Sequence, residues 1–219
     1  MNKIQPTAKQ PQEKDVLLSF LSGTVSYTKA HKKSVLTGLV ILVLAAVLGI
    51  AYSTHVKNVE EKSWAAYYNA QLAVMADPSA LAQLDAVTQR FPNTNAGQYA
   101  QLLKGDILYA RENFAQAADA YKSLLNAHNE ILRTAATLSL AAAQQATKNY
   151  ADSIEILTKF IEKNPKSFAL PQAYFTLAMS QELAGQKQQA VETYRQILAD
   201  YTKTYFGAVA KDKLAALNK

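Results

Sequence analysis

Side chains capable of chemistry are few in this chain, and they stand far apart. The three histidines, His31, His55 and His128, form no pair at the spacing of metal ligands, and His128 is expected to be an exposed residue at a helix end. The carboxylates of Glu60 and Glu61 fall at an expected helix start, where negative charge favours the helix dipole. The sequence therefore predicts no catalytic residue, no metal site and no cofactor.

The composition removes further classes of site. The chain has no cysteine, which excludes disulfide bonds, thiolate catalysis and zinc–thiolate centres. Neither a glycine-rich phosphate loop nor a Gly-x-Ser-x-Gly nucleophile motif is present. Residues 1–33 carry +4 of the net charge of +6, and residues 54–219 show no basic stripe interleaved with aromatic residues. We therefore expect no enzyme activity, no small-molecule substrate and no nucleic-acid binding, which leaves the binding of proteins.

The most distinctive segment is Val35 to Tyr52, eighteen residues without a charge. As a helix it would be about 27 Å long, close to the roughly 30 Å hydrocarbon core of a bilayer. The alternative is a buried helix of a soluble core, but such helices usually keep a polar stripe, and this segment has only Thr37. Residues 34–53 are therefore predicted to form a transmembrane signal anchor in contact with membrane lipid.

The charges beside this segment predict its orientation. Residues 1–33 hold six lysines against two acidic residues, and Lys29, Lys32 and Lys33 lie directly before the apolar segment. Because lysine excess stays on the cytoplasmic side, residues 1–33 are expected inside and residues 54–219 outside. A cleaved signal peptide is the alternative, but its apolar core is usually about 7–15 residues long. No small-x-small cleavage site follows Tyr52.

The N-terminal tail has one patterned segment. Its apolar residues recur at helical spacing, at Val16, Leu17, Phe20 and Leu21. This pattern predicts either a short amphipathic helix on the inner leaflet or a loosely structured tail. Residues 1–10 are polar and are expected to be disordered.

Beyond the apolar segment the sequence repeats at intervals of 36 or 37 residues. A small residue recurs at Ala80, Ala117, Ser153 and Ala190. A larger apolar residue follows four positions later, at Leu84, Tyr121, Leu157 and Tyr194, and another three positions after that, at Val87, Leu124, Phe160 and Ile197. One helix earlier, the same spacing connects Tyr68, Gly105, Ala141 and Ala178. Each unit is therefore predicted to be a pair of helices, A and B, with these residues in the core between them.

At these positions the chain resembles the tetratricopeptide repeat family. Matching features are the aromatic residue early in helix A, the Leu-small pair, the aromatic residue opening helix B and the proline after helix B: Trp64, Tyr174, Leu140-Ala141, Leu177-Ala178, Phe114, Tyr150, Pro92 and Pro165. The turn glycine of the family appears at Gly185, with Glu112 and Asn149-Tyr150 in its place elsewhere. The resemblance implies an all-α fold, a single transmembrane helix followed by an α-solenoid, with units at 60–94, 98–133, 134–168 and 171–206 and a capping helix at 205–217. The first unit is the most degenerate, and the cap is expected to turn Ala208, Leu214 and Leu217 inward.

In this family the inner face of the solenoid binds partner proteins. Carried onto this chain, the lining positions are Ala65, Asn69, Leu72, Leu102, Asp106, Tyr109, Leu138, Ala142, Gln145, Phe175, Met179 and Glu182. The lysine and asparagine clamp that some relatives use for a partner's terminal carboxylate is missing. Half of the lining is apolar, which suits helices or unfolded apolar segments. The alternative is that several of these side chains are buried against the neighbouring A helix.

The order of tail, anchor and repeats resembles the ancillary subunit of the bacterial Sec translocon. That resemblance implies a single-pass protein of the bacterial inner membrane, with a periplasmic repeat domain that assists translocation or hand-over to periplasmic chaperones. The alternative is an envelope scaffold for cell-wall or outer-membrane assembly. It is suggested by the segments ahead of three A helices, at 90–94, 163–167 and 200–204.

Overall fold

The computed structural model describes residues 13–77 and 79–217 of the chain. Every regular element in this part is a helix. Residues 1–10, for which disorder was expected, lie outside the described residues. The chain divides into two compact units, Met1–Lys57 and Asn58–Lys219. We describe each unit by itself.

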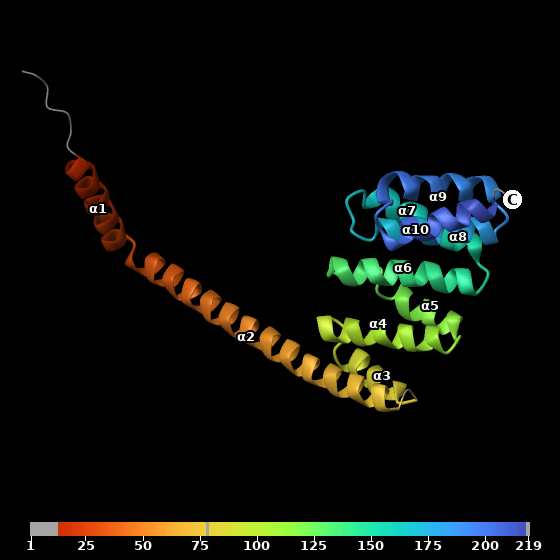
Figure 1. The fold of residues 1–219 in the computed structure, drawn as a ribbon. Helices are drawn as coiled ribbons and strands as arrows, with labels where there is room; N and C mark the ends of the chain where they lie inside the picture. Colours follow the sequence, from red (N-terminus) through yellow and green to blue (C-terminus); the bar gives the residue numbers. More distant parts are fainter. Residues whose placement is uncertain (1–12, 78, 218–219) are drawn as a thin grey trace, which may run out of the picture. The chain divides into compact units, whose positions relative to one another are not determined.

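The first unit contains α1, Glu13–Ala30, and the first part of α2, Lys32–Ala76 (Figure 1). The apolar segment Val35–Tyr52 lies wholly within α2, and its side chains from Leu36 onward are all exposed. This exposure argues against the buried core helix considered above. In the described part of the chain, α2 is the one helix long and apolar enough to cross a membrane.

Helix α1 covers the segment for which an amphipathic helix was one of two expectations. Leu18, Phe20 and Leu21 are exposed. The side chains of Val16 and Leu17 lie outside the described residues. An arrangement of α1 on a membrane surface stays a prediction.

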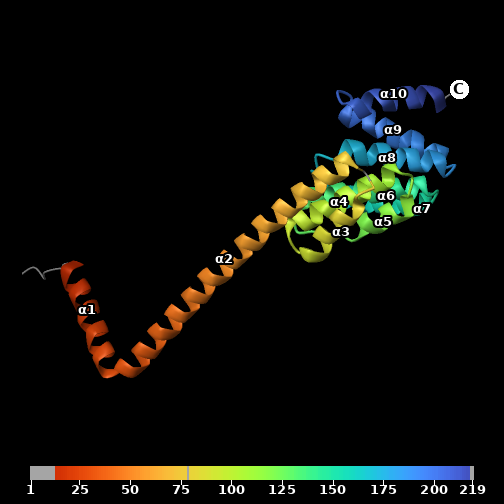
Figure 2. The same cartoon turned by 90° about the horizontal axis from the view of Figure 1, so that it is seen from below.

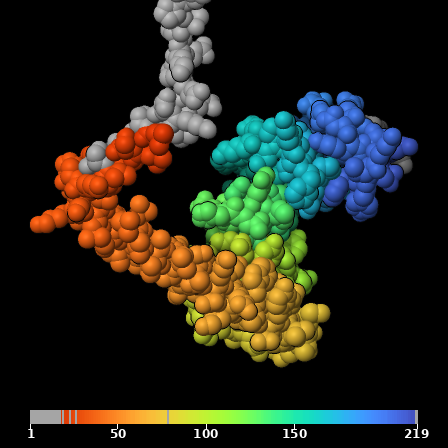
Figure 3. All heavy atoms as spheres, turned by 90° about the vertical axis from the view of Figure 1, so that its left-hand side faces the viewer, coloured from red at the N-terminus to blue at the C-terminus, as the bar shows by residue number. Residues whose placement is uncertain are grey.

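The second unit is a stack of paired helices. It contains the last part of α2 followed by α3 Leu81–Arg90, α4 Asn95–Ala110, α5 Phe114–Lys122, α6 Glu130–Ala146, α7 Tyr150–Lys163, α8 Leu170–Leu183, α9 Lys187–Tyr201 and α10 Tyr205–Leu217. From α3 to α10 each helix contacts the next, and α4, α6, α8 and α10 also contact one another in that order (Figure 2). We call the last part of α2 together with these four helices the A helices, and α3, α5, α7 and α9 the B helices. Figure 3 shows the same succession in side chains, from yellow α3 through green to blue α10.

The B-helix positions selected from the repeat form the core of this unit. Leu84, Tyr121, Leu157 and Tyr194 are all at most 2% exposed, and Val87, Leu124, Phe160 and Ile197 are buried with them. Small residues on the A helices make room for them. A Cβ on Gly105 would lie 2.5 Å from Cε1 of the Tyr121 ring, so only glycine fits beneath this tyrosine.

The first helix pair departs from the predicted register. Tyr68, expected in the core, is 55% exposed, and Tyr67, Ala70 and Val74 are buried instead. The cause is the connection between α2 and α3, which has four residues, whereas the next three A-to-B connections have three. The extra residue shifts helix A by one position relative to helix B. Such a shift changes which face of helix A meets the core.

Two connections from a B helix to the next A helix, those before α4 and α10, use the same turn. Thr94 Oγ1 accepts a hydrogen bond from the Gly97 N–H at 3.1 Å, and Thr204 Oγ1 accepts one from the Gly207 N–H at 3.1 Å. Each threonine N–H also donates to a carbonyl three residues earlier, that of Phe91 or Tyr201. These bonds satisfy donors that a helix start leaves unpaired. The segments 90–94 and 200–204 therefore have a structural explanation as helix starts.

The last three turns from helix A to helix B each place one residue in the left-handed region. These residues are Glu112 (φ 61°), Lys148 (φ 66°) and Gly185 (φ 77°). In each turn the N–H after this residue donates to a carbonyl five residues earlier, as in a Schellman motif. The expected substitute for the turn glycine between α6 and α7, Asn149-Tyr150, lies one position after Lys148, the residue with positive φ. Only Gly185 has the residue type that this backbone favours.

We expect Lys148→Gly to raise the free energy of unfolding by about 0.5–1 kcal/mol, because a side chain is strained at positive φ. Urea unfolding of the full-length protein in detergent, followed by circular dichroism, measures the change. Gly185→Ala is the matched control, since nothing lies within 4 Å of its added Cβ and backbone strain alone should lower stability. A loss of stability in Lys148→Gly would contradict the prediction.

The buried face of α10 and the starts of two repeats differ from expectation. In α10 the buried residues are Gly207, Ala210 and Leu214, and Ala208 is exposed. Helix α4 begins at Asn95, three residues before the expected start of its repeat at 98, and α6 begins at Glu130, four residues before the expected start at 134. The connection from α5 to α6, residues 123–129, is the longest between consecutive helices in this stack.

Candidate functional site

The A helices carry all the side chains predicted to line a binding surface, but part of that lining is packed. Leu138 is 6% exposed and belongs to a core cluster with Ala169 and Ala173 at the α6–α8 contact. Leu102 is half-buried and packs against the cluster that contains Leu132 and Ala136 of α6. Both side chains therefore fill the space between neighbouring A helices.

Phe175 and Met179 are half-buried in the cluster that α10 completes. The Phe175 ring lies 5.5 Å from the Phe206 ring and 6.1 Å from the Tyr194 ring, measured between centroids. Helix α10 thus packs on the A-helix side of the last unit and uses these residues as its own contact surface. The sequence predicted a cap but did not show which face it covers.

The accessible part of the predicted lining is more polar than expected. Leu72 is 66% exposed and Asp106 is also exposed, while Tyr109, Gln145 and Glu182 are half-buried. The Nε2 atom of Gln145 is buried and has no hydrogen-bond partner among the described residues. A partner that meets this surface would find one aliphatic side chain and several hydrogen-bonding groups.

Two of the acidic lining residues are joined to buried tyrosines of B helices. The Tyr121 hydroxyl donates to Asp106 Oδ1 at 2.8 Å, and the Tyr194 hydroxyl donates to Glu182 Oε2 at 3.0 Å. Burial and the neighbouring carboxylate raise the pKa of both tyrosines above the usual value. Each pair links the accessible A-helix surface to the core of its unit. These long-range contacts were not visible in the sequence.

The two pairs differ in their surroundings. Lys213 Nζ of α10 lies 3.2 Å from Glu182 Oε2, so a cation completes the last pair. Beside Asp106 there is instead a hollow of about 220 Å³, lined by Asp106, Tyr109, Tyr121, Ser139 and Ala142. Partial burial raises the pKa of Asp106, and the hydrogen bond from Tyr121 opposes this shift. The hollow brings together three predicted lining positions, Asp106, Tyr109 and Ala142.

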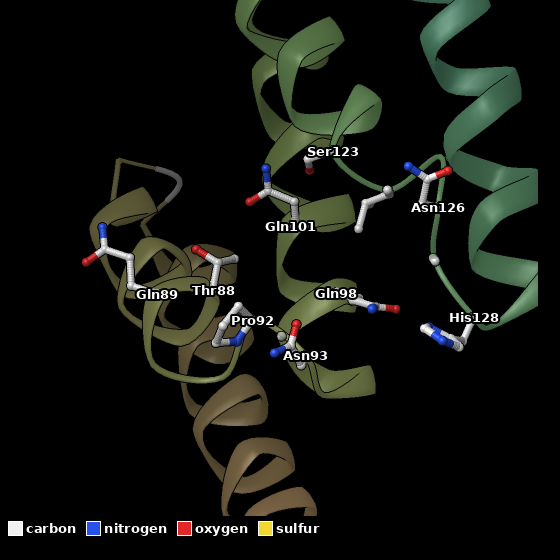
Figure 4. A pocket seen from close by; sticks show the side chains of 12 residues that line it. Thr88, Gln89, Pro92, Asn93, Gln98, Gln101, Ser123, Asn126 and His128 are labelled. Carbon is white, nitrogen blue, oxygen red and sulfur yellow. The ribbon is translucent and has the colours of Figure 1, made fainter.

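A second, larger pocket of about 500 Å³ lies between α3, α4 and the connection before α6. Figure 4 shows its labelled lining: Thr88, Gln89, Pro92, Asn93, Gln98, Gln101, Ser123, Asn126 and His128. Amide side chains dominate, and each can both donate and accept hydrogen bonds. This pocket was not expected from the sequence, although its segments are rich in glutamine and asparagine. His128 is exposed, but it lies in the connection rather than at a helix end.

The described ranges 13–77 and 79–217 contain no group of three or more histidine, cysteine, aspartate or glutamate side chains that could hold an ion. What the site offers chemically is hydrogen bonding, the Asp106 carboxylate, which forms no ion pair within the described residues, and limited apolar contact.

Comparison with known families identifies the family to which this stack of helices belongs. A model described as a tetratricopeptide repeat-like domain matches residues 26–172, and a tetratricopeptide repeat model matches residues 172–204. The chain belongs to the tetratricopeptide repeat-like family. The first match includes the apolar segment Val35–Tyr52 as well as the repeats. A search among curated proteins finds no match.

Membership makes the second unit a protein–protein interaction module. Tetratricopeptide repeat domains typically serve as non-catalytic scaffolds, consistent with the lack of a catalytic motif in the sequence. The A-helix surface is the place to look for a partner in such a domain.

The tetratricopeptide repeat domain should lose stability in alkali. The folded-state pKa values of Tyr121 and Tyr194 are raised, so their contribution is fully present below the unfolded pKa near 10 and is lost as pH rises above it. The expected slope is about 1.4 kcal/mol per pH unit for each tyrosine. Urea unfolding between neutral and strongly alkaline pH measures it. Tyr194→Phe should reduce the slope, whereas Tyr150→Phe, at a half-buried position on α7, is the control. An unchanged slope in Tyr194→Phe would contradict the explanation.

Proposed function

We propose that this protein is anchored in the bacterial inner membrane by α2 and binds partner proteins through its A helices on the periplasmic side. In this role it assists protein translocation or the hand-over of emerging chains to periplasmic chaperones. The observation that carries the proposal is the continuity of the family match across the apolar segment and the repeats. It supports a family in which the anchor and the interaction module occur together.

The orientation follows from charge. The +4 charge of residues 1–33 favours a cytoplasmic N-terminus, which puts the repeat domain on the outer side. The apolar segment Val35–Tyr52 would contact lipid, and the exposure of its side chains suits this environment. A reporter fused after Lys219 tests the orientation. Activity only in the cytosol would overturn it.

The partner is best sought by photo-crosslinking in intact cells. Benzoylphenylalanine in place of Leu72 presents the reactive group at an exposed A-helix position, and in place of Tyr109 it presents the group at a half-buried position beside Phe114. The matched control is the same group at Gln188, which is exposed on the B helix α9. Phe175 is a poorer position because α10 packs against it. We expect components of the translocon or a periplasmic chaperone to be trapped from Leu72 and Tyr109 but not from Gln188.

The same experiment separates the alternative role. Trapping only cell-wall or outer-membrane assembly proteins would favour the envelope scaffold. Equal trapping from both helix faces would contradict binding through the A helices. The segments 90–94 and 200–204, which suggested a scaffold, are explained by the turns that start α4 and α10.

A further inference from the structure

One repeat position on consecutive A helices holds side chains of different size and charge. Ser139 of α6, Thr176 of α8 and Lys213 of α10 are spaced by 37 residues each, the period of the repeat. They therefore occupy equivalent places on three helices that contact one another in this order. Only the last of them is a cation.

At the last unit the fold itself places an ammonium group on an acid–tyrosine pair. Lys213 Nζ lies 3.2 Å from Oε2 of Glu182 and 3.4 Å from Oε1, and Oε2 also accepts the Tyr194 hydroxyl at 3.0 Å. A carboxylate held by a buried hydroxyl and facing a lysine is thus a combination that this fold already uses.

Between α4 and α6 the same combination lacks its cation. Asp106 and Tyr121 form the pair. Asp106 follows the small residue Gly105 by one position, whereas Glu182 follows Ala178 by four, so the two acids lie about one helical turn apart in the repeat. The residue of α6 that corresponds to Lys213 is the short Ser139, which lines the hollow of about 220 Å³ beside Asp106. No lysine, arginine or histidine lines it, and Asp106 makes no ion pair within the described part of the chain.

We propose that this hollow binds the ammonium group of a lysine side chain from a partner polypeptide. Oδ1 of Asp106 is engaged by Tyr121, and the second carboxylate oxygen is left for a charge-assisted hydrogen bond. The Tyr109 ring in the wall offers an aromatic surface to a cation, and the Ser139 hydroxyl offers an acceptor. Lysine is a compact charge on a flexible stem, which suits a small hollow. The proposal rests on the proposed binding of partners by the A helices and names the chemistry of one contact.

The test uses the full-length protein in detergent with ¹³C-labelled tyrosine, titrated with N-acetyl-lysine methylamide. We expect saturable changes in the NMR signals of Tyr109 and Tyr121. The ε-acetylated form of the same probe, which has no charge, should bind at least about tenfold more weakly. Asp106→Asn should remove the response, and Asp119→Asn, an exposed acid on α5, should retain it.

A second variant keeps Asp106 and fills the hollow from within. Ser139→Lys introduces a lysine in the wall of the hollow, at the repeat position of Lys213, and should abolish the response to the probe by occupying Asp106. Circular dichroism of each variant shows that the fold is intact. An equal response of the wild type and Asp106→Asn, or equal binding of the acetylated probe, would overturn the proposal.

The outcome is separable from that of the proposed function. Photo-crosslinking from Leu72 that persists unchanged in Ser139→Lys, together with no response to the lysine probe, would leave the proposed function standing and overturn the lysine contact. A specific response to the probe without any trapped partner would support the hollow and contradict the proposed function.

Discussion

Gly97→Ala is expected to lower the free energy of unfolding of the repeat domain by about 3 kcal/mol or more. A Cβ at this position would lie 1.9 Å from the carbonyl oxygen of Phe91, and backbone atoms cannot yield as a flexible side chain can. The turn that starts α4 must then open, which breaks the hydrogen bond from the Gly97 N–H to Thr94. Urea unfolding of the full-length protein, followed by circular dichroism, measures the loss.

The matched control is Asn95→Ala, an exposed position in the first turn of the same helix, where the change should stay within about 0.5 kcal/mol. Thr94→Ala should lie between the two, at about 1 kcal/mol, because it removes only the capping side chain. A cost for Gly97→Ala no larger than that of Thr94→Ala would contradict the steric explanation.

Replacement of Leu42 and Leu44 by lysine should release the protein from the membrane. Both side chains are exposed near the middle of the apolar segment. A lysine at the centre of a membrane helix costs about 2.5–3.5 kcal/mol, so the pair should cost about 5–7 kcal/mol. Carbonate extraction and fractionation of cells measure the distribution between membrane and soluble fractions.

The control for this prediction is Leu42→Ile with Leu44→Val, which keeps the segment apolar and should leave the protein in the membrane fraction. The lysine variant should retain the helical circular dichroism of the repeats, because those residues belong to the other compact unit. A lysine variant that remains resistant to extraction would contradict a membrane-spanning role for the segment.

Much of the fold could be predicted because the repeat places equivalent residues at a fixed spacing. Leu157 and Tyr194 were assigned to the core from spacing alone and are fully buried. The same reasoning failed for Tyr68, since one extra residue in the connection after α2 shifts helix A by a position. A period reports which residues are equivalent, but it does not report the length of each connection.

The candidate site was less predictable because it depends on contacts between units. Asp106 was selected from its position, but its bond to Tyr121 joins residues on two helices and leaves no local pattern. For Phe175 the sequence left open whether it lines a groove or packs on the next A helix, and the structure places it against Phe206 of α10. Ser139 lines the hollow beside Asp106, and its small size is informative only once Lys213 is seen at the corresponding repeat position of α10.

Helix α10 is joined to the preceding A helix by two kinds of contact. Lys213 forms an ion pair with Glu182, and the Phe206 ring packs on Phe175. Dissolved salt screens a partly exposed ion pair, but it does not weaken apolar packing in the same way. The junction of α10 with α8 should therefore persist at high ionic strength.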